Sequence, residues 1–141
     1  MSHLLRFNQM KNKNYHELFP GVLTSGYSNA ESVYIEDDLF VFLRPAIKNG
    51  YEPFESFNRF EIPKENRVQI ISEFVLIKEY LYNHQTIELT EYIQPHFKTQ
   101  TENFLKKFLK NKVLIEEIIN DLITWIEEQL ITNECITLIG L

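Results

Sequence analysis

The stretch that decides the fold is residues 113–131, VLIEEIINDLITWIEEQLI. Its apolar side chains recur every three or four residues and share one broad face of a helical wheel: Ile115, Ile118, Ile119, Leu122, Ile123, Trp125, Ile126 and Leu130. The polar side chains share the opposite face: Glu116, Glu117, Asn120, Asp121, Thr124, Glu127 and Glu128. Only Gln129 and Ile131 depart from this pattern. The period predicts an amphipathic helix over residues 113–131 whose apolar face packs on a core.

The charge of this stretch separates it from the rest of the chain. No Lys or Arg follows Lys112, whereas six acids do: Glu116, Glu117, Asp121, Glu127, Glu128 and Glu134. Residues 1–112 hold all 14 basic residues and the other 14 acids, so the formal charge of −6 belongs to the last 29 residues.

Exposed helix faces usually mix charges of both signs at i, i+4, because such pairs stabilise a helix. Here Glu117 and Asp121 repel each other at that spacing, and Lys112 is the only cation that we expect within reach. Two interpretations stay open. The face is either an ordinary solvated exterior or a surface whose field steers a basic partner. The residues that would bind such a partner are Glu116, Glu117, Asp121, Glu127 and Glu128.

Upstream of this helix, the sequence predicts strands. β-branched and aromatic residues at 33–35 and 39–44 predict two antiparallel strands, joined by a tight acidic turn at residues 36–38. Asn49-Gly50 predicts a second hairpin turn. Residues 54–62 then either return to the sheet or form a helical turn, because their three Phe residues are spaced by three. Residues 18–23 predict a short extended segment broken by a Pro-Gly turn.

Two further helices and a late strand complete the prediction. Pro63 and Glu65 suit the first turn of a helix over residues 63–83. Thr99 and Glu102 have the spacing of a capping box and open a helix over residues 99–110. Residues 135–141, CITLIGL, predict a short strand at an edge of the sheet. The sum is an α+β fold in which a small antiparallel sheet, mainly from the N-terminal half, packs against about three helices.

The bulk properties describe one globular domain over residues 1–141, with the polar residues 1–16 as a loosely attached arm. A negative net charge argues against direct binding of nucleic acid, which needs Lys and Arg to replace counterions. A single cysteine excludes a disulfide framework and a cysteine-rich zinc site. No stretch has the length and apolarity of a signal sequence or a membrane span, so we expect a cytoplasmic protein.

No catalytic set and no cofactor site emerges from the residue spacing. The four histidines, at positions 3, 16, 84 and 96, lack the short spacing of metal ligands. Cys135 stands beside Glu134, which raises the pKa of a thiol, and we interpret it as a small buried hydrophobe. One of three hypotheses is a small enzyme that acts on a phosphorylated substrate through Arg44, Arg59 and a histidine.

In size, acidity and Asn/Lys/Ile-rich composition, the chain resembles the immunity proteins of bacterial contact-dependent inhibition and polymorphic toxin systems. This resemblance rests on these properties and on no diagnostic motif. It implies a cytosolic binding protein that neutralises a cognate toxin domain, often a basic nuclease, by covering its active or substrate-binding surface. A homo-oligomeric adaptor or structural protein, such as a homodimer, is the alternative, with subunit contacts through residues 136–141 and the arm at 1–16.

Overall fold

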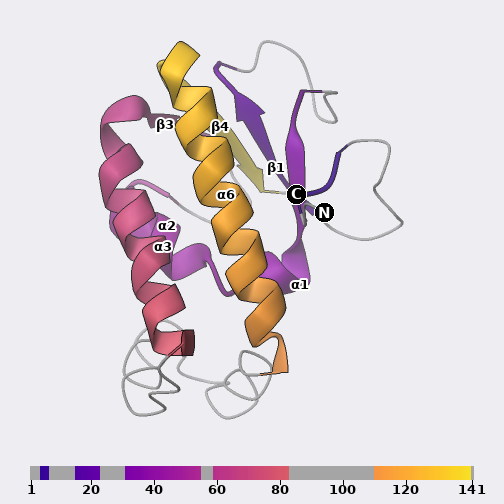
Figure 1. Cartoon of the computed structure of the whole chain (residues 1–141). Coiled ribbons are helices and arrows are strands. Elements are labelled where there is room, and N and C mark those ends of the chain that lie inside the picture. Colours follow the sequence, from indigo (N-terminus) through magenta and orange to yellow (C-terminus); the bar gives the residue numbers. More distant parts are fainter. Residues whose placement is uncertain (1–3, 7–14, 23–30, 55–58, 83–109, 141) are drawn as a thin grey trace.

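The fold is built on a four-stranded antiparallel sheet. The computed structural model describes residues 4–6, 15–22, 31–54, 59–82 and 110–140. The strands β1 (Tyr15–Pro20), β2 (Val33–Glu36), β3 (Arg59–Pro63) and β4 (Cys135–Gly140) lie in the order β2-β1-β4-β3 (Figure 1). Three of the four strands come from the first half of the chain, as the sequence predicts.

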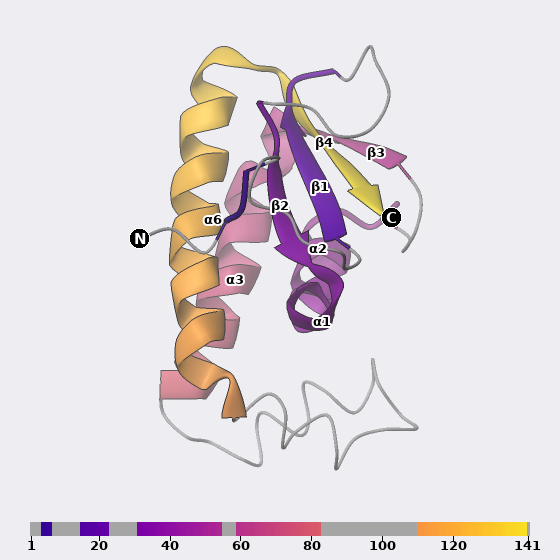
Figure 2. The ribbon, with the colours of Figure 1, turned by 90° about the vertical axis from the view of Figure 1, so that its right-hand side faces the viewer.

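Two long helices cover one face of this sheet. Helices α3 (Arg67–Tyr82) and α6 (Lys112–Thr132) lie side by side and run in opposite directions (Figures 1 and 2). The short helices α1 (Asp37–Phe40) and α2 (Arg44–Gly50) lie at one end of the strands (Figure 2). The α+β prediction is confirmed, and the helix predicted at 113–131 differs from α6 by one residue at each end. The helix predicted at 99–110 falls almost wholly outside the described residues.

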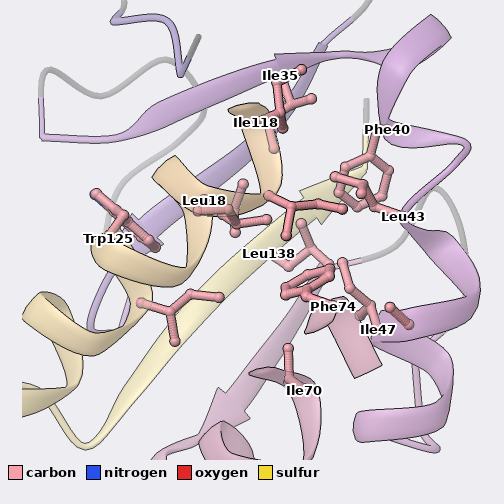
Figure 3. Packing of buried hydrophobic residues seen from close by; sticks show 14 of the residues in the cluster. Leu18, Ile35, Phe40, Leu43, Ile47, Ile70, Phe74, Ile118, Trp125 and Leu138 are labelled. Atoms are coloured by element: carbon pink, nitrogen blue, oxygen red, sulfur yellow. The ribbon is translucent and has the colours of Figure 1, made fainter. Parts of the chain in front are cut away.

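The core lies between the sheet and the two long helices. Leu18 and Leu138 are opposite each other in β1 and β4, and their side chains face those of Phe74 from α3 and Ile118 from α6 (Figure 3). All four side chains are 2% exposed or less. Burial of a side chain of this size contributes roughly 1.5–3 kcal/mol, so the core holds α6 firmly on the sheet.

The C-terminal strand lies inside the sheet and not at its edge. β4 pairs with β1 on one side and with β3 on the other, and both pairings are antiparallel. The prediction of an edge strand is therefore wrong. Side chains of β4 are buried on both faces of the sheet: Ile136 and Leu138 lie on one face, and Thr137 and Ile139 lie on the other. Apart from Thr137, the side chains of CITLIGL are apolar, which is the sequence signal for this position.

Residues 37–50 form two short helices joined by a turn at residues 41–43, so the strand predicted at 39–44 and the hairpin turn at Asn49-Gly50 are both wrong. Strand β2 ends at Glu36, and α1 begins at Asp37. Phe40, Leu43 and Ile47 are all buried, with spacings of three and four that put them on one side of a helical path. Pro45 sits in the first turn of α2, where its missing N–H is not needed.

Gly50 has its place because α2 packs closely on α3. A Cβ atom at this position would lie 2.4 Å from Ile70 Cγ1 and 2.8 Å from Ile70 Cα. The glycine therefore permits a helix contact and does not form a hairpin. By contrast, Gly21 has a φ of 89° and ends β1, which confirms the predicted Pro-Gly turn.

The beginnings of two predicted elements shift. The helix predicted from Pro63 begins at Arg67, because Pro63 is still in β3 and a 3-10 turn at Lys64–Asn66 comes between. The predicted arm cannot extend to residue 16, because Tyr15 and His16 belong to β1. Leu5 also pairs with Tyr34 through two backbone hydrogen bonds of 3.0 and 2.8 Å. The intervening residues 7–14 lie outside the described part.

Candidate functional site

Helix α6 is a firmly anchored platform. Its buried residues form one face over about four turns: Ile115, Ile118, Ile119, Leu122, Trp125, Ile126 and Leu130. This is the face predicted from the wheel, except that Ile123 is only partly buried. Ile131, which departs from the pattern, is 72% exposed. The opposite face is thereby turned outward along the whole length of the helix.

The five acids predicted to bind a partner lie in two rows on α6. Successive residues of an α-helix are rotated by about 100°. Glu116 and Glu127 therefore share the side toward α3. The other three acids share a row rotated by about 100° around the helix axis: Glu117, Asp121 and Glu128. We call the second set the outer row. Glu117, Glu127 and Glu128 are exposed, and Glu116 and Asp121 are partly buried.

The row toward α3 has cations near it. The Lys78 ammonium of α3 donates a hydrogen bond to Asn120 Oδ1, and Arg67 lies across a groove from Glu127. The expectation that Lys112 is the only cation within reach is therefore wrong for this row. Sequence alone could not show these neighbours, because Lys78 and Asn120 are 42 positions apart.

Glu116 is the acid least suited to contact a partner. Its Oε1 atom is buried and has no hydrogen-bond partner among the described residues. The same holds for Nε1 of Trp125 on the core side of α6. A buried polar atom without a partner costs roughly 1–3 kcal/mol, so these two atoms weaken the anchoring of the helix slightly.

A second group of polar side chains lies where β1 meets α1 and α2. His16 Nε2 lies 2.7 Å from Asp37 Oδ1, and the same oxygen accepts a hydrogen bond of 3.0 Å from an amino group of Arg44. The His16 ring also stacks on Phe40, with ring centroids 3.9 Å apart. We call His16, Asp37 and Arg44 the Asp37 cluster. The sequence reasoning missed it because 21 positions separate His16 from Asp37.

The charge state of His16 follows from its burial. The His16 side chain is 1% exposed, whereas those of Arg44 and Asp37 are 22% and 32% exposed. Burial lowers the pKa of His16 and outweighs the hydrogen bond and the charge of Asp37, which raise it. The imidazole is therefore neutral near pH 7 and donates its Nε2 proton to the Asp37 carboxylate.

The structure brings together Arg44 and one histidine of the enzyme hypothesis, His16, and places Arg59 elsewhere. Arg59 is opposite Ile139 in the sheet, and Ile139 is opposite Glu17, so Arg59 shares a face with Glu17 and not with His16. Arg44, in contrast, contacts the same Asp37 oxygen as His16. His84 and His96 lie outside the described residues. Arg59 therefore lies on the opposite face of the sheet from His16.

Two other features complete the polar interior. Ser32 donates a hydrogen bond of 2.6 Å to Glu17, and both side chains are fully buried.

Cys135 is buried as predicted, and its pKa is raised first by burial and then by the Glu61 and Glu134 carboxylates. A protonated thiol is a poor nucleophile. No group of three His, Cys, Asp or Glu residues in the described ranges could hold a metal ion.

Comparisons with protein families, with curated proteins and with solved structures found no match. Within the described part of the chain, no helix is both long and apolar enough to cross a membrane. The assignment of a function therefore depends on the surface chemistry of α6 and its neighbours.

Proposed function

We propose that this chain is an inhibitory binding protein of the immunity class, which neutralises a basic toxin domain through the outward face of α6. One observation carries the proposal. The last 29 residues hold six acids and no Lys or Arg, and Glu117, Glu127 and Glu128 are exposed on one helix.

The anchoring of α6 supports a role in docking. The helix buries seven side chains, so its exposed acids project from a backbone that stays in place. A rigid surface needs little ordering when a partner binds, which favours affinity.

The field of this face determines the class of partner. A concentration of one sign of charge attracts the opposite sign over about 8 Å at physiological ionic strength. Such a face speeds the association of a basic protein and repels nucleic acid. A toxin nuclease carries a basic surface that grips phosphates, and the acids of α6 would occupy that surface in their place. The proposed compartment is the cytoplasm, where such a toxin acts.

The homodimer remains an alternative with a narrower basis. Residues 136–140 form an interior strand, so they cannot add to a sheet of another subunit. A homodimer would have to use other surfaces. Sedimentation at several concentrations tests it, since a monomer at all of them would contradict it.

A pull-down with a matched pair of variants tests the proposed function. The bait is the full chain as wild type, as the double variant Glu117→Lys/Glu128→Lys, or as the control Glu52→Lys/Glu61→Lys. The control makes the same change in net charge at two exposed acids, and Glu61 lies on the face of the sheet that is turned away from α6.

We expect the wild type and the control to retain one basic protein from a host lysate and to release it as salt is raised. The variant Glu117→Lys/Glu128→Lys should fail to retain that protein even at low salt. Equal retention by all three baits would show that α6 is not the docking face. Recovery of the bait protein alone would favour the homodimer.

A further inference from the structure

A groove runs between α3 and α6 on the side away from the sheet. It has a volume of about 460 Å³ and is lined by Arg67, Val68, Ile71 and Ser72 from α3 and by Glu127 and Ile131 from α6. The two helices are antiparallel here, so the beginning of α3 faces the end of α6 (Figure 1). The groove therefore adjoins the acids of the last turns of α6.

Apolar side chains border this groove although they are open to water. Val68 and Ile131 of the lining are 68% and 72% exposed. Beyond the lining, Val75 of α3 is 40% exposed. The buried side of α3 is formed by other residues, Ile70, Phe74 and Ile77. Helix α3 thus presents apolar residues on two sides, and only one of them is used by the fold.

The walls of the groove differ in charge. Glu127 belongs to the α6 wall, and Glu128 follows it at the surface. Arg67 belongs to the α3 wall. A segment that lies in the groove should therefore place cations over α6, and it should avoid cations over the beginning of α3.

We infer that this groove receives a basic amphipathic helix of the toxin partner. Its apolar side chains contact Val68, Ile71 and Ile131, and Lys or Arg along one edge contact Glu127 and Glu128. This inference rests on the proposed function and adds the apolar half of the interface. An amphipathic helix can turn one apolar face toward Val68, Ile71 and Ile131 and place cations on the edge next to that face. A second copy of this chain fits less well, because it would bring its own acids against those of α6.

The probe is a labelled peptide of about 18 Leu and Lys residues whose Leu side chains share one helical face. A second peptide of the same composition, with Leu distributed around the helix, controls for charge alone. Fluorescence anisotropy measures the Kd of each peptide for the full chain at low and at physiological salt.

Exposed apolar positions allow matched variants that leave the core intact. Val68→Ser/Ile131→Ser removes the apolar border, whereas Val113→Ser changes a 66% exposed valine about 27 Å away along the same helix. We expect Val68→Ser/Ile131→Ser to raise the Kd of the amphipathic peptide at least tenfold. Val113→Ser should leave this Kd unchanged. Glu127→Gln should weaken binding, and Arg67→Gln should strengthen it.

Two results would overturn the inference. One is that the amphipathic peptide binds the wild type no better than its scrambled control. The other is that Val68→Ser/Ile131→Ser binds the amphipathic peptide with the same Kd as the wild type. If Glu117→Lys/Glu128→Lys still weakens both peptides in the second case, the acidic docking surface stands and only the groove is excluded. A different result is that Glu117→Lys/Glu128→Lys leaves the Kd of both peptides unchanged while Val68→Ser/Ile131→Ser no longer binds the amphipathic peptide. In that case the groove stands, and the electrostatic part of the proposed function is wrong.

Discussion

The Asp37 carboxylate accepts hydrogen bonds from His16 and Arg44, whereas Glu127 and Glu128 extend into solvent from a helix whose only cation is its first residue, Lys112. Both regions carry charge on a helix that packs on the same core. In the first, the fold itself supplies the partners and fixes the orientation of β1, α1 and α2. In the second, the fold supplies an anchored helix, and Arg67 of α3 lies across a groove from Glu127. The proposed docking role of the α6 acids rests on the exposure of Glu117, Glu127 and Glu128.

The largest expected effect comes from the platform itself. Leu122→Ala removes a fully buried side chain of α6 and should lower the free energy of unfolding by about 2–5 kcal/mol. Ile131→Ala, on the exposed side of the same helix, should change it by less than about 0.5 kcal/mol. Urea denaturation measures both. Similar losses in the two variants would contradict an anchored inner face and a free outer one.

Removal of the acid of the Asp37 cluster should have the next largest effect. Asp37→Ala leaves the largely buried Arg44 without this hydrogen bond and should destabilise the fold by about 1–3 kcal/mol. The control Glu128→Ala removes an exposed carboxylate and should be nearly neutral. A neutral Asp37→Ala would mean that the cluster does not stabilise the fold.

The pH dependence of stability should report His16. Its pKa in the folded state is lowered from the ordinary value of 6.5, chiefly by burial, so the unfolded chain binds the proton more readily. The contribution of His16 to the free energy of unfolding is complete above about pH 6.5. It falls as the pH decreases toward the pKa of His16 in the folded state.

We expect this loss between pH 7.5 and 5.5 to be smaller in His16→Gln. An NMR titration of the His16 ring gives the pKa directly. A value at or above 6.5 would contradict a neutral, buried imidazole.

The smallest effect should come from the outer row. Glu117→Lys/Glu128→Lys relieves repulsion on α6 and should change the free energy of unfolding by less than about 0.5 kcal/mol, toward greater stability. Thermal unfolding at low salt gives the most sensitive comparison, because salt screens the repulsion. A marked destabilisation would show that these acids serve the fold after all.

The secondary structure of segments with a clear apolar period could be predicted from the sequence. It could not be predicted where contacts between distant segments determine the local structure. The helix at 113–131 follows from apolar spacing alone, and α6 agrees within one residue at each end. Residues 39–43, by contrast, form a short apolar run that suits a buried strand as well as a helix. Asn49-Gly50 looks like a hairpin turn, but Gly50 is needed because Ile70 of α3 comes too close for a Cβ atom.

The candidate site divides in the same way. The sequence places the acids on the outward face of one helix, because that depends on local periodicity. It cannot show that Lys78 and Arg67 of α3 lie beside one row, or that Oε1 of Glu116 is buried. The Asp37 cluster was missed because strand β1 and the first turn of α1 meet only in the folded chain.

The most direct test of the account is the association rate between this chain and the basic protein that it retains, measured by stopped flow at two salt concentrations. We predict that Glu117→Lys/Glu128→Lys slows association at least tenfold at low salt, that Glu52→Lys/Glu61→Lys changes it little, and that raised salt reduces the difference. Equal rates for the two double variants at low salt would contradict the claim that the acids of α6 face a partner.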